Sequence, residues 1–156
     1  MGHWPTSRPH QGFWPGRRLK AAPANGFHST TGYGFAAVGI GAAFSAWLRW
    51  GLSLWLNGLT PAVPAGTLVA NLIGGYLIGI AVAYFAANTS IAPEWRLFAI
   101  TGFLGGLTTF STFSAESVAL LQQARYLAAL AHSGLHLIGS VLATIGGFAT
   151  WRAFSA

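Results

Sequence analysis

The sequence predicts an all-α integral membrane protein with four transmembrane helices and a break in the third. Of its 156 residues, 53% are hydrophobic and only 6% are charged, whereas roughly a quarter of residues are charged in ordinary soluble domains. The apolar residues fall into four runs, and each run reaches the ~20 residues that a helix needs to cross a bilayer. A stretch rich in glycine and threonine lies inside the third run.

Residues 1–32 differ from the rest of the chain and are expected to form a disordered basic tail. They hold four of the seven prolines and four of the eight cationic residues. No apolar segment typical of a signal peptide precedes the first span. An upstream extension of the gene model is the alternative explanation for this tail. The four-helix transmembrane domain is expected to cover residues 33–154.

The four predicted spans cover residues 33–56, 66–87, 95–121 and 126–151. Short segments join them, and the first two of these segments contain proline, which ends helices. In the second and fourth spans, glycine and alanine recur at every fourth position. This spacing lets helix backbones approach closely in lipid.

Outside the tail, the arginines divide evenly between the two ends of the predicted bundle. An even number of spans returns the chain to the side where it started, so Arg96 and Arg152 lie on one side and Arg49 and Arg125 on the other. The positive-inside rule then gives no preferred orientation. The chain is therefore expected to insert both ways and to pair with a second, antiparallel copy. Four spans are also too few to surround a wide aqueous path by themselves.

The inventory of polar side chains excludes most enzymes. The chain has no cysteine and no aspartate, and its acidic residues are Glu94 and Glu116 alone. A Ser-His-Asp triad, a carboxylate pair for glycoside hydrolysis and a thiolate metal site are therefore ruled out. The formal charge is +6, but the cations beyond the tail are spaced singly, so nucleic-acid binding is not expected.

Three motifs resemble those of one family. They are "GIGAAFSAWLRW", "GTLVANLIGGYLIG" and "TGFLGGLTTFSTFSAE", and in this order and spacing they resemble the Fluc (CrcB-type) fluoride channels. The resemblance covers about residues 36–154. It implies a dual-topology antiparallel homodimer with two pores, which passively exports cytoplasmic fluoride across the bacterial inner membrane and reduces fluoride toxicity. It also implies a structural sodium ion at the dimer centre.

Several side chains are candidates for the fluoride path. Asn71, in the middle of the second span, offers two amide donors, and an interhelical hydrogen bond is its alternative role. The resemblance places Phe110 and Phe113 along the path, where the positive edge of an aromatic ring can face an anion. Packing is the alternative for both rings. The resemblance also favours Ser140 and Thr112, although hydroxyls in helices often bond the carbonyl four residues earlier.

The stretch at the centre of the third span is poor helix material, because Gly105, Gly106 and the pair Thr108 and Thr109 disfavour helix. A break there would release carbonyl oxygens inside the membrane, and a hard cation such as Na⁺ would satisfy them. The resemblance implies that the sodium ligands are the carbonyl oxygens of Gly105 and Thr108 from each chain. An unbroken helix with self-bonded hydroxyls is the alternative.

The roles of four further polar side chains stay open. Arg49 either attracts anions to a vestibule or has a structural role. Glu116 is expected to bond backbone or hydroxyl groups, because a carboxylate would repel fluoride. His132 and His136 depart from the family pattern. Their i, i+4 spacing suits a metal site, but the sequence offers no evident third ligand. Protonated, they would instead add positive charge near the pore.

Two other functions fit the sequence less well. A small multidrug-type exporter also has four helices, but it needs a membrane-embedded carboxylate, and the first span contains none. A purely structural membrane subunit would leave Asn71 and the two phenylalanines without a purpose. The sequence therefore predicts fluoride conduction.

Overall fold

The computed structural model describes residues 24–57 and 65–155, with side chains from residue 31 onward. Within these ranges the chain forms seven helical segments: α1 (Ala24–Asn57), α2 (Ala65–Ala87), α3 (Pro93–Arg96), the π-helix η1 (Leu97–Leu104), α4 (Gly105–Leu107), α5 (Phe110–Gln122) and α6 (Tyr126–Ser155). Four stretches are long and apolar enough to cross a membrane: Thr31–Asn57, Ala65–Ala87, Pro93–Gln122 and Tyr126–Ser155. The predicted four-span, all-helical architecture is confirmed.

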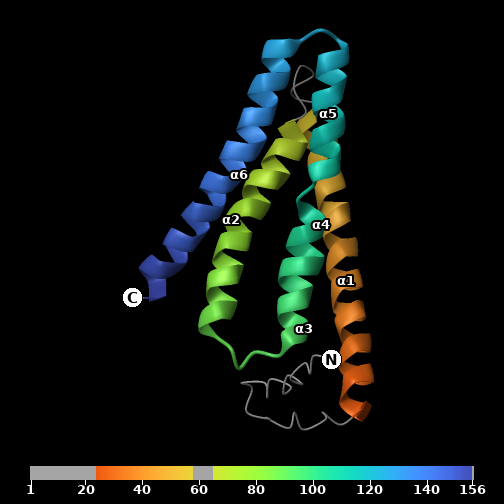
Figure 1. Ribbon diagram of the computed structural model, residues 1–156, viewed down its shortest axis with the longest axis vertical. Helices are drawn as coiled ribbons and strands as arrows, with labels where there is room; N and C mark the ends of the chain where they lie inside the picture. The colour runs from red at the N-terminus through yellow and green to blue at the C-terminus, as the bar shows by residue number, and fades with distance from the viewer. Residues whose placement is uncertain (1–23, 58–64, 156) are drawn as a thin grey trace, which may run out of the picture.

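The spans run alternately up and down the bundle (Figure 1). The third span consists of α3, η1, α4 and α5 in succession, and it lies alongside α1, while α2 lies alongside α6. The beginning of α1 and the end of α6 are at the same end of the bundle, as an even number of spans requires.

The first helix begins earlier than the sequence analysis expected. Residues 24–32, assigned to the tail, form the first turns of α1. Pro23 directly precedes this helix and no other proline follows before Pro61, so no residue in between prevents the helix from extending back to Ala24. Residues 1–23 of the predicted tail lie outside the described residues.

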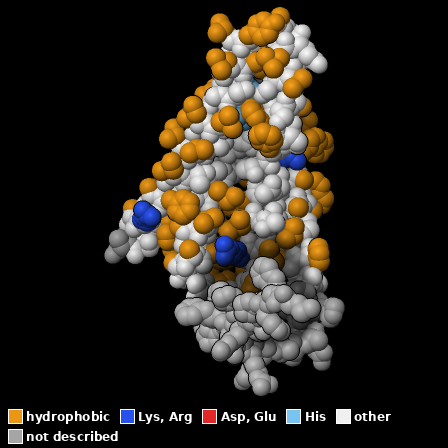
Figure 2. Space-filling view, viewed as in Figure 1, with side chains coloured by type: hydrophobic (Ala, Val, Ile, Leu, Met, Phe, Trp, Pro, Cys, Tyr) orange, Lys and Arg blue, Asp and Glu red, His pale blue; other side chains and the backbone are white. Residues whose placement is uncertain are grey.

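Apolar side chains cover most of the outer surface. Figure 2 shows hydrophobic side chains over the described part of the visible face, with cationic side chains only at isolated points. Leu127 on α6 is 84% exposed, and Phe154 near its end is 87% exposed. A surface of this kind suits lipid or another apolar protein surface, so this is a multi-pass membrane protein.

Glycines allow α2 and α6 to touch backbone to backbone. A β-carbon at Gly79 would collide with the carbonyl oxygen of Thr144, and one at Gly147 would collide with that of Tyr76. By contrast, a β-carbon at Gly134, also on α6, would meet nothing within 4 Å. The predicted small-residue packing of the second and fourth spans is confirmed at this α2–α6 seam.

The α1 helix approaches the third span in the same way. A β-carbon at Gly102 would meet the α1 backbone at Val38, with the carbonyl oxygen 2.7 Å away. Further along, Ser45 is fully buried against Gly106, and its hydroxyl donates to the carbonyl of Ala42 at 3.0 Å. These contacts fix the part of the third span that leads into the candidate site.

Candidate functional site

Helix α4 ends at Leu107 and α5 begins at Phe110, and the two residues between them have extended backbones. Thr108 has φ −80° and ψ 149°, and Thr109 has φ −146° and ψ 118°. Thr109 caps the new helix, because its hydroxyl accepts a hydrogen bond from the backbone N–H of Thr112 at 3.2 Å. We refer to Thr108 and Thr109 as the interruption.

Asn71 on α2 binds the backbone of the interruption from the side. The N–H of Thr109 donates to Oδ1 of Asn71 at 2.8 Å, and Nδ2 of Asn71 donates to the carbonyl of Thr109 at 3.2 Å. The asparagine amide therefore takes the place of a neighbouring strand for one extended residue. The interhelical role that the sequence left open for Asn71 is thus present, and Asn71 is only 8% exposed.

The carbonyl oxygens around the interruption differ in whether they have a protein partner. That of Gly106 accepts a hydrogen bond from Nε of Arg49 at 3.2 Å, and that of Thr109 accepts from Asn71. The carbonyl oxygens of Gly105 and Thr108 take part in none of the hydrogen bonds around these described residues. Arg49 thus contacts the third span.

A cleft of about 290 Å³ opens beside the interruption. Its lining comes from α2, the third span and α6: Asn71, Gly75, Thr108, Thr109, Phe110, Phe113, His136, Leu137, Ser140 and Val141. Most of this lining is apolar, with a few amide, hydroxyl and imidazole groups, and it contains no charged lysine, arginine, aspartate or glutamate side chain. Such a lining can bind a small ligand through neutral donors.

The structure brings together four of the six predicted path residues at this cleft, namely Asn71, Phe110, Phe113 and Ser140. The rings of Phe110 and Phe113 have centroids 5.4 Å apart. Phe113 is buried, with 8% of its surface exposed, whereas Phe110 is 73% exposed. Thr112 and Arg49 are not among the residues that line this cleft. Thr112 bonds Thr109, and Arg49 bonds Gly106.

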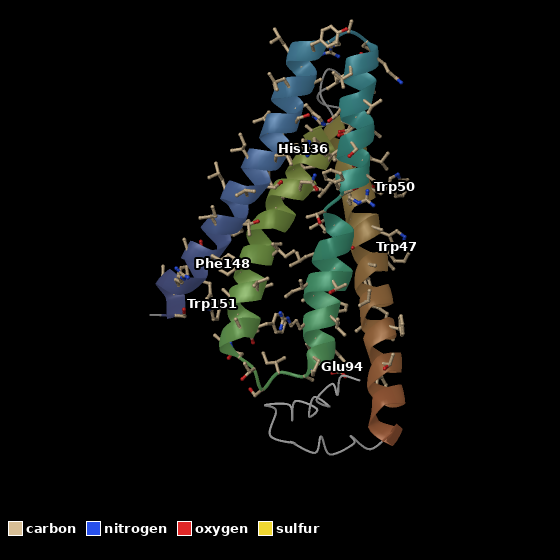
Figure 3. All side chains as sticks on the ribbon, viewed as in Figure 1. Trp47, Trp50, Glu94, His136, Phe148 and Trp151 are labelled. Carbon is tan, nitrogen blue, oxygen red and sulfur yellow. The ribbon has the colours of Figure 1, made fainter. Side chains whose placement is uncertain are left out.

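A polar cluster lies directly behind Phe113. Glu116 on α5 accepts a hydrogen bond at Oε1 from the hydroxyl of Thr67 at 2.6 Å, and its Oε2 lies 3.4 Å from Nε2 of His132. The ring of His136 is 4.4 Å from that of His132, and its Nδ1 lies 3.0 Å from Nδ2 of Asn71. Figure 3 shows His136 on α6, where that helix lies close to α2 and α5.

The link between Thr67 and Glu116 was not predicted from the sequence. Glu116 was expected to bond backbone or hydroxyl groups, which is correct, but no local signal indicates Thr67 on a different helix. The i, i+4 spacing of His132 and His136 was visible in the sequence, yet the third member of their cluster was not. Trp47 and Trp50, in contrast, project outward from α1, away from this cluster (Figure 3).

Comparison with known proteins adds three findings. A sequence model of the family described as "CrcB-like protein, Camphor Resistance (CrcB)" matches residues 36–148. A protein of Pseudomonas putida (strain W619), named fluoride-specific ion channel FluC, is 63% identical over 115 residues, which are 74% of this chain and 91% of that protein. A protein of the same name from Ralstonia pickettii (strain 12J) is 56% identical over 125 residues, 80% of this chain and 99% of that protein.

Proposed function

Since this chain belongs to the CrcB-like family, we propose that it is a fluoride channel that passively exports cytoplasmic fluoride across the inner membrane of a bacterium. The relatives carry the name of an ion channel, so the chain is not an enzyme. Membership of the family agrees with the resemblance found in its three sequence motifs.

The observation that carries the proposal is the lining of the cleft. Fluoride is small and strongly hydrated, so a narrow path must replace its water with hydrogen-bond donors. Ser140 offers a hydroxyl donor, and the edges of Phe110 and Phe113 offer the positive rim of an aromatic ring. Because no fixed cation lines the cleft, an anion would be stabilised there without being trapped.

Asn71 has a different part in this proposal from the one expected. Both of its amide donors already have partners, Thr109 and His136. Asn71 therefore holds the backbone of the interruption in place, and its contact with fluoride would require one of these bonds to open. Thr112 supports the same region through the cap of α5.

We also propose that a second, antiparallel copy completes each path. Phe110 leaves 73% of its surface exposed in the single chain, although it lies at the mouth of the cleft. A partner surface would cover it and close the cleft on that side. The even division of the four arginines between the two ends supports insertion in both orientations. Each dimer would contain two such paths.

A structural sodium ion at the dimer axis fits the interruption. The carbonyl oxygens of Gly105 and Thr108, which the resemblance assigned to Na⁺, accept none of the loop or side-chain hydrogen bonds that the described residues form there. Gly105 is exposed on the outside of the single chain, where a partner can approach. Two antiparallel copies would offer four carbonyl oxygens, which a hard cation prefers.

Fluoride efflux from liposomes that contain the purified chain tests the function. We expect fluoride to leave these liposomes while chloride stays inside, because the narrow neutral path suits the smaller anion. Liposomes without protein are the control. Chloride efflux as fast as fluoride efflux would contradict the proposal.

Purification without sodium tests the ion. With Li⁺ or N-methylglucamine in place of Na⁺, we expect a lower melting temperature of the detergent-solubilised dimer, since the carbonyl oxygens at the axis lose their partner. An unchanged melting temperature across these three cations would argue against a bound structural sodium.

A further inference from the structure

Three ligating side chains converge inside the bundle, next to the cleft. Glu116 comes from α5, and His132 and His136 come from successive turns of α6; one ligating atom of each lies within 4.8 Å of the other two. Among the described residues, Oε2 of Glu116 and Nε2 of both histidines are buried without a hydrogen bond, although Oε2 and Nε2 of His132 lie 3.4 Å apart as an ion pair. Each histidine is only 3% exposed. Buried polar atoms without partners are costly, and their convergence indicates a ligand.

We propose that Glu116, His132 and His136 bind a divalent transition-metal ion, with Zn²⁺ as the best match. Two imidazole nitrogens and one carboxylate oxygen suit Zn²⁺ and its neighbours, whereas Mg²⁺ and Ca²⁺ prefer oxygen ligands alone. Metal–ligand bonds of about 2.0–2.2 Å place two tetrahedral ligand atoms about 3.4 Å apart. The distance from Oε2 of Glu116 to Nε2 of His132 is 3.4 Å.

Neighbouring side chains orient these ligands. Thr67 holds the other carboxylate oxygen of Glu116, which leaves Oε2 facing the histidines. The ring of Phe113 stacks on both imidazoles, with centroid distances of 5.7 Å to His132 and 5.0 Å to His136. Supports of this kind fix ring orientation in metal sites. His136 also lines the cleft, so the site borders the cleft.

Metal binding conflicts with the contact between Asn71 and His136. The N–H of Thr109 can only donate, so Oδ1 of Asn71 must face it, and Nδ2 of Asn71 must therefore face His136 and donate to its Nδ1. The single proton of the neutral imidazole then sits on Nε2. Coordination of the metal at Nε2 moves that proton to Nδ1. The N–H of Nδ1 in His136 and the N–H of Nδ2 in Asn71 would then face each other, and both are donors. Coordination at Nδ1 displaces Asn71 directly.

Either mode of coordination breaks the hydrogen bond between Asn71 and His136. Asn71 is also the residue that binds both backbone groups of Thr109 at the interruption. Metal binding is therefore expected to disturb the cleft and to slow fluoride flux, a consequence that rests on the proposed channel function. The binding itself does not rest on that function.

Calorimetric titration of the purified full-length chain with Zn²⁺ tests the site. His3, His10 and His28 are first changed to Gln in every sample, so that the N-terminal histidines do not contribute. We expect one saturable Zn²⁺ per chain and no binding of Mg²⁺. Glu116→Gln, His132→Gln and His136→Gln should each weaken Zn²⁺ binding about tenfold or more. No saturable binding, or an affinity in all three variants equal to that of the protein with its site intact, would overturn the proposal.

Two further measurements protect the test against misfolded variants. Co²⁺ bound to the chain with its site intact should give the intense visible absorption of a four- or five-coordinate ion. Adding Zn²⁺ should then remove this absorption. The weak spectrum of aqueous Co²⁺ would contradict the site. Asn71→Asp supplies an acceptor for Nδ1–H of His136 but loses the donor to the carbonyl of Thr109, so this variant, once shown to be folded by circular dichroism, should bind Zn²⁺ about tenfold more tightly. Unchanged or weaker Zn²⁺ binding would show that metal coordination does not conflict with the hydrogen bond between Asn71 and His136.

Efflux measured with and without Zn²⁺ separates the two proposals. We expect Zn²⁺ to slow fluoride efflux. In His132→Gln, the efflux rate with Zn²⁺ should come close to the rate without Zn²⁺. A chain that binds Zn²⁺ but conducts no fluoride would overturn the channel function and leave the metal site standing. A chain that conducts fluoride but binds no Zn²⁺ would overturn the metal site and leave the channel function standing.

Discussion

The α2–α6 seam and the interruption are both places where helices meet deep in the bundle, but different forces hold them. At the seam, Gly79 and Gly147 let two backbones touch, and close packing decides the fit at these two positions. At the interruption, Asn71 and Arg49 bond backbone groups that helical hydrogen bonds no longer satisfy. Adding an atom at the seam should therefore lower the stability of the protein. At the interruption, removing a hydrogen-bond donor or acceptor should lower it.

The largest effect is expected from Gly147→Ala. The new methyl group would meet the carbonyl oxygen of Tyr76, and rigid backbone on both helices prevents relief. We expect a loss of about 3 kcal/mol of stability, at the upper end of overpacking effects. Reversible unfolding in mixed micelles measures this loss.

Gly134→Ala is the matched control on the same helix, since its methyl group meets nothing within 4 Å. Because alanine favours helix over glycine, this variant should be unchanged or more stable by up to about 1 kcal/mol. Equal losses in both variants would mean that close backbone contact does not determine the seam.

A smaller loss is expected from Asn71→Ala, which removes the partners of both backbone groups of Thr109. Buried groups without partners should cost about 2–3 kcal/mol. Fluoride efflux should also fall, because the interruption loses its support. Asn88→Ala is the control, since that amide bonds an exposed carbonyl at the end of α2. A stable, fully conducting Asn71→Ala protein would refute the role given to Asn71.

Thr109→Ala removes the cap of α5 and should cost about 1 kcal/mol. Thr109→Ser keeps the hydroxyl and should restore most of this loss, measured by the same unfolding experiment. If serine were as damaging as alanine, the methyl group of Thr109 rather than its hydroxyl would be the stabilising part.

The smallest effect is expected from Arg49→Lys. Lysine keeps the positive charge but has no Nε–H group to donate to the carbonyl of Gly106. If Arg49 has a structural role, we expect this variant to lose about 0.6 kcal/mol of stability, the average for hydrogen bonds between membrane helices. A variant with full stability but altered fluoride flux would instead favour the vestibule role.

Features that depend on composition or local spacing could be predicted from the sequence. The four spans follow from runs of apolar residues, and the seam follows from small residues at every fourth position. Asn71 stood out because an amide is rare in such a segment. The glycines and threonines around residue 108 identified the region where extended backbone occurs.

Features that depend on contacts between distant segments could not be predicted. The hydrogen bond from Thr67 to Glu116 joins α2 to α5, and nothing near either residue indicates the other. The same holds for Arg49 and Gly106. The third member of the histidine cluster became visible only when α5 and α6 were placed side by side. The π-helical form of η1 has no sequence signal that we identify.

Labelling of single cysteines tests most directly whether oppositely oriented copies form the channel. The chain has no cysteine, so Ser90→Cys, between α2 and α3, and Gln123→Cys, between α5 and α6, are clean probes at opposite ends of the bundle. In intact cells, an impermeant maleimide should label about half of each variant, because the four arginines beyond the N-terminal tail divide evenly between the two ends of the bundle. Full labelling of one variant and none of the other would contradict the antiparallel channel.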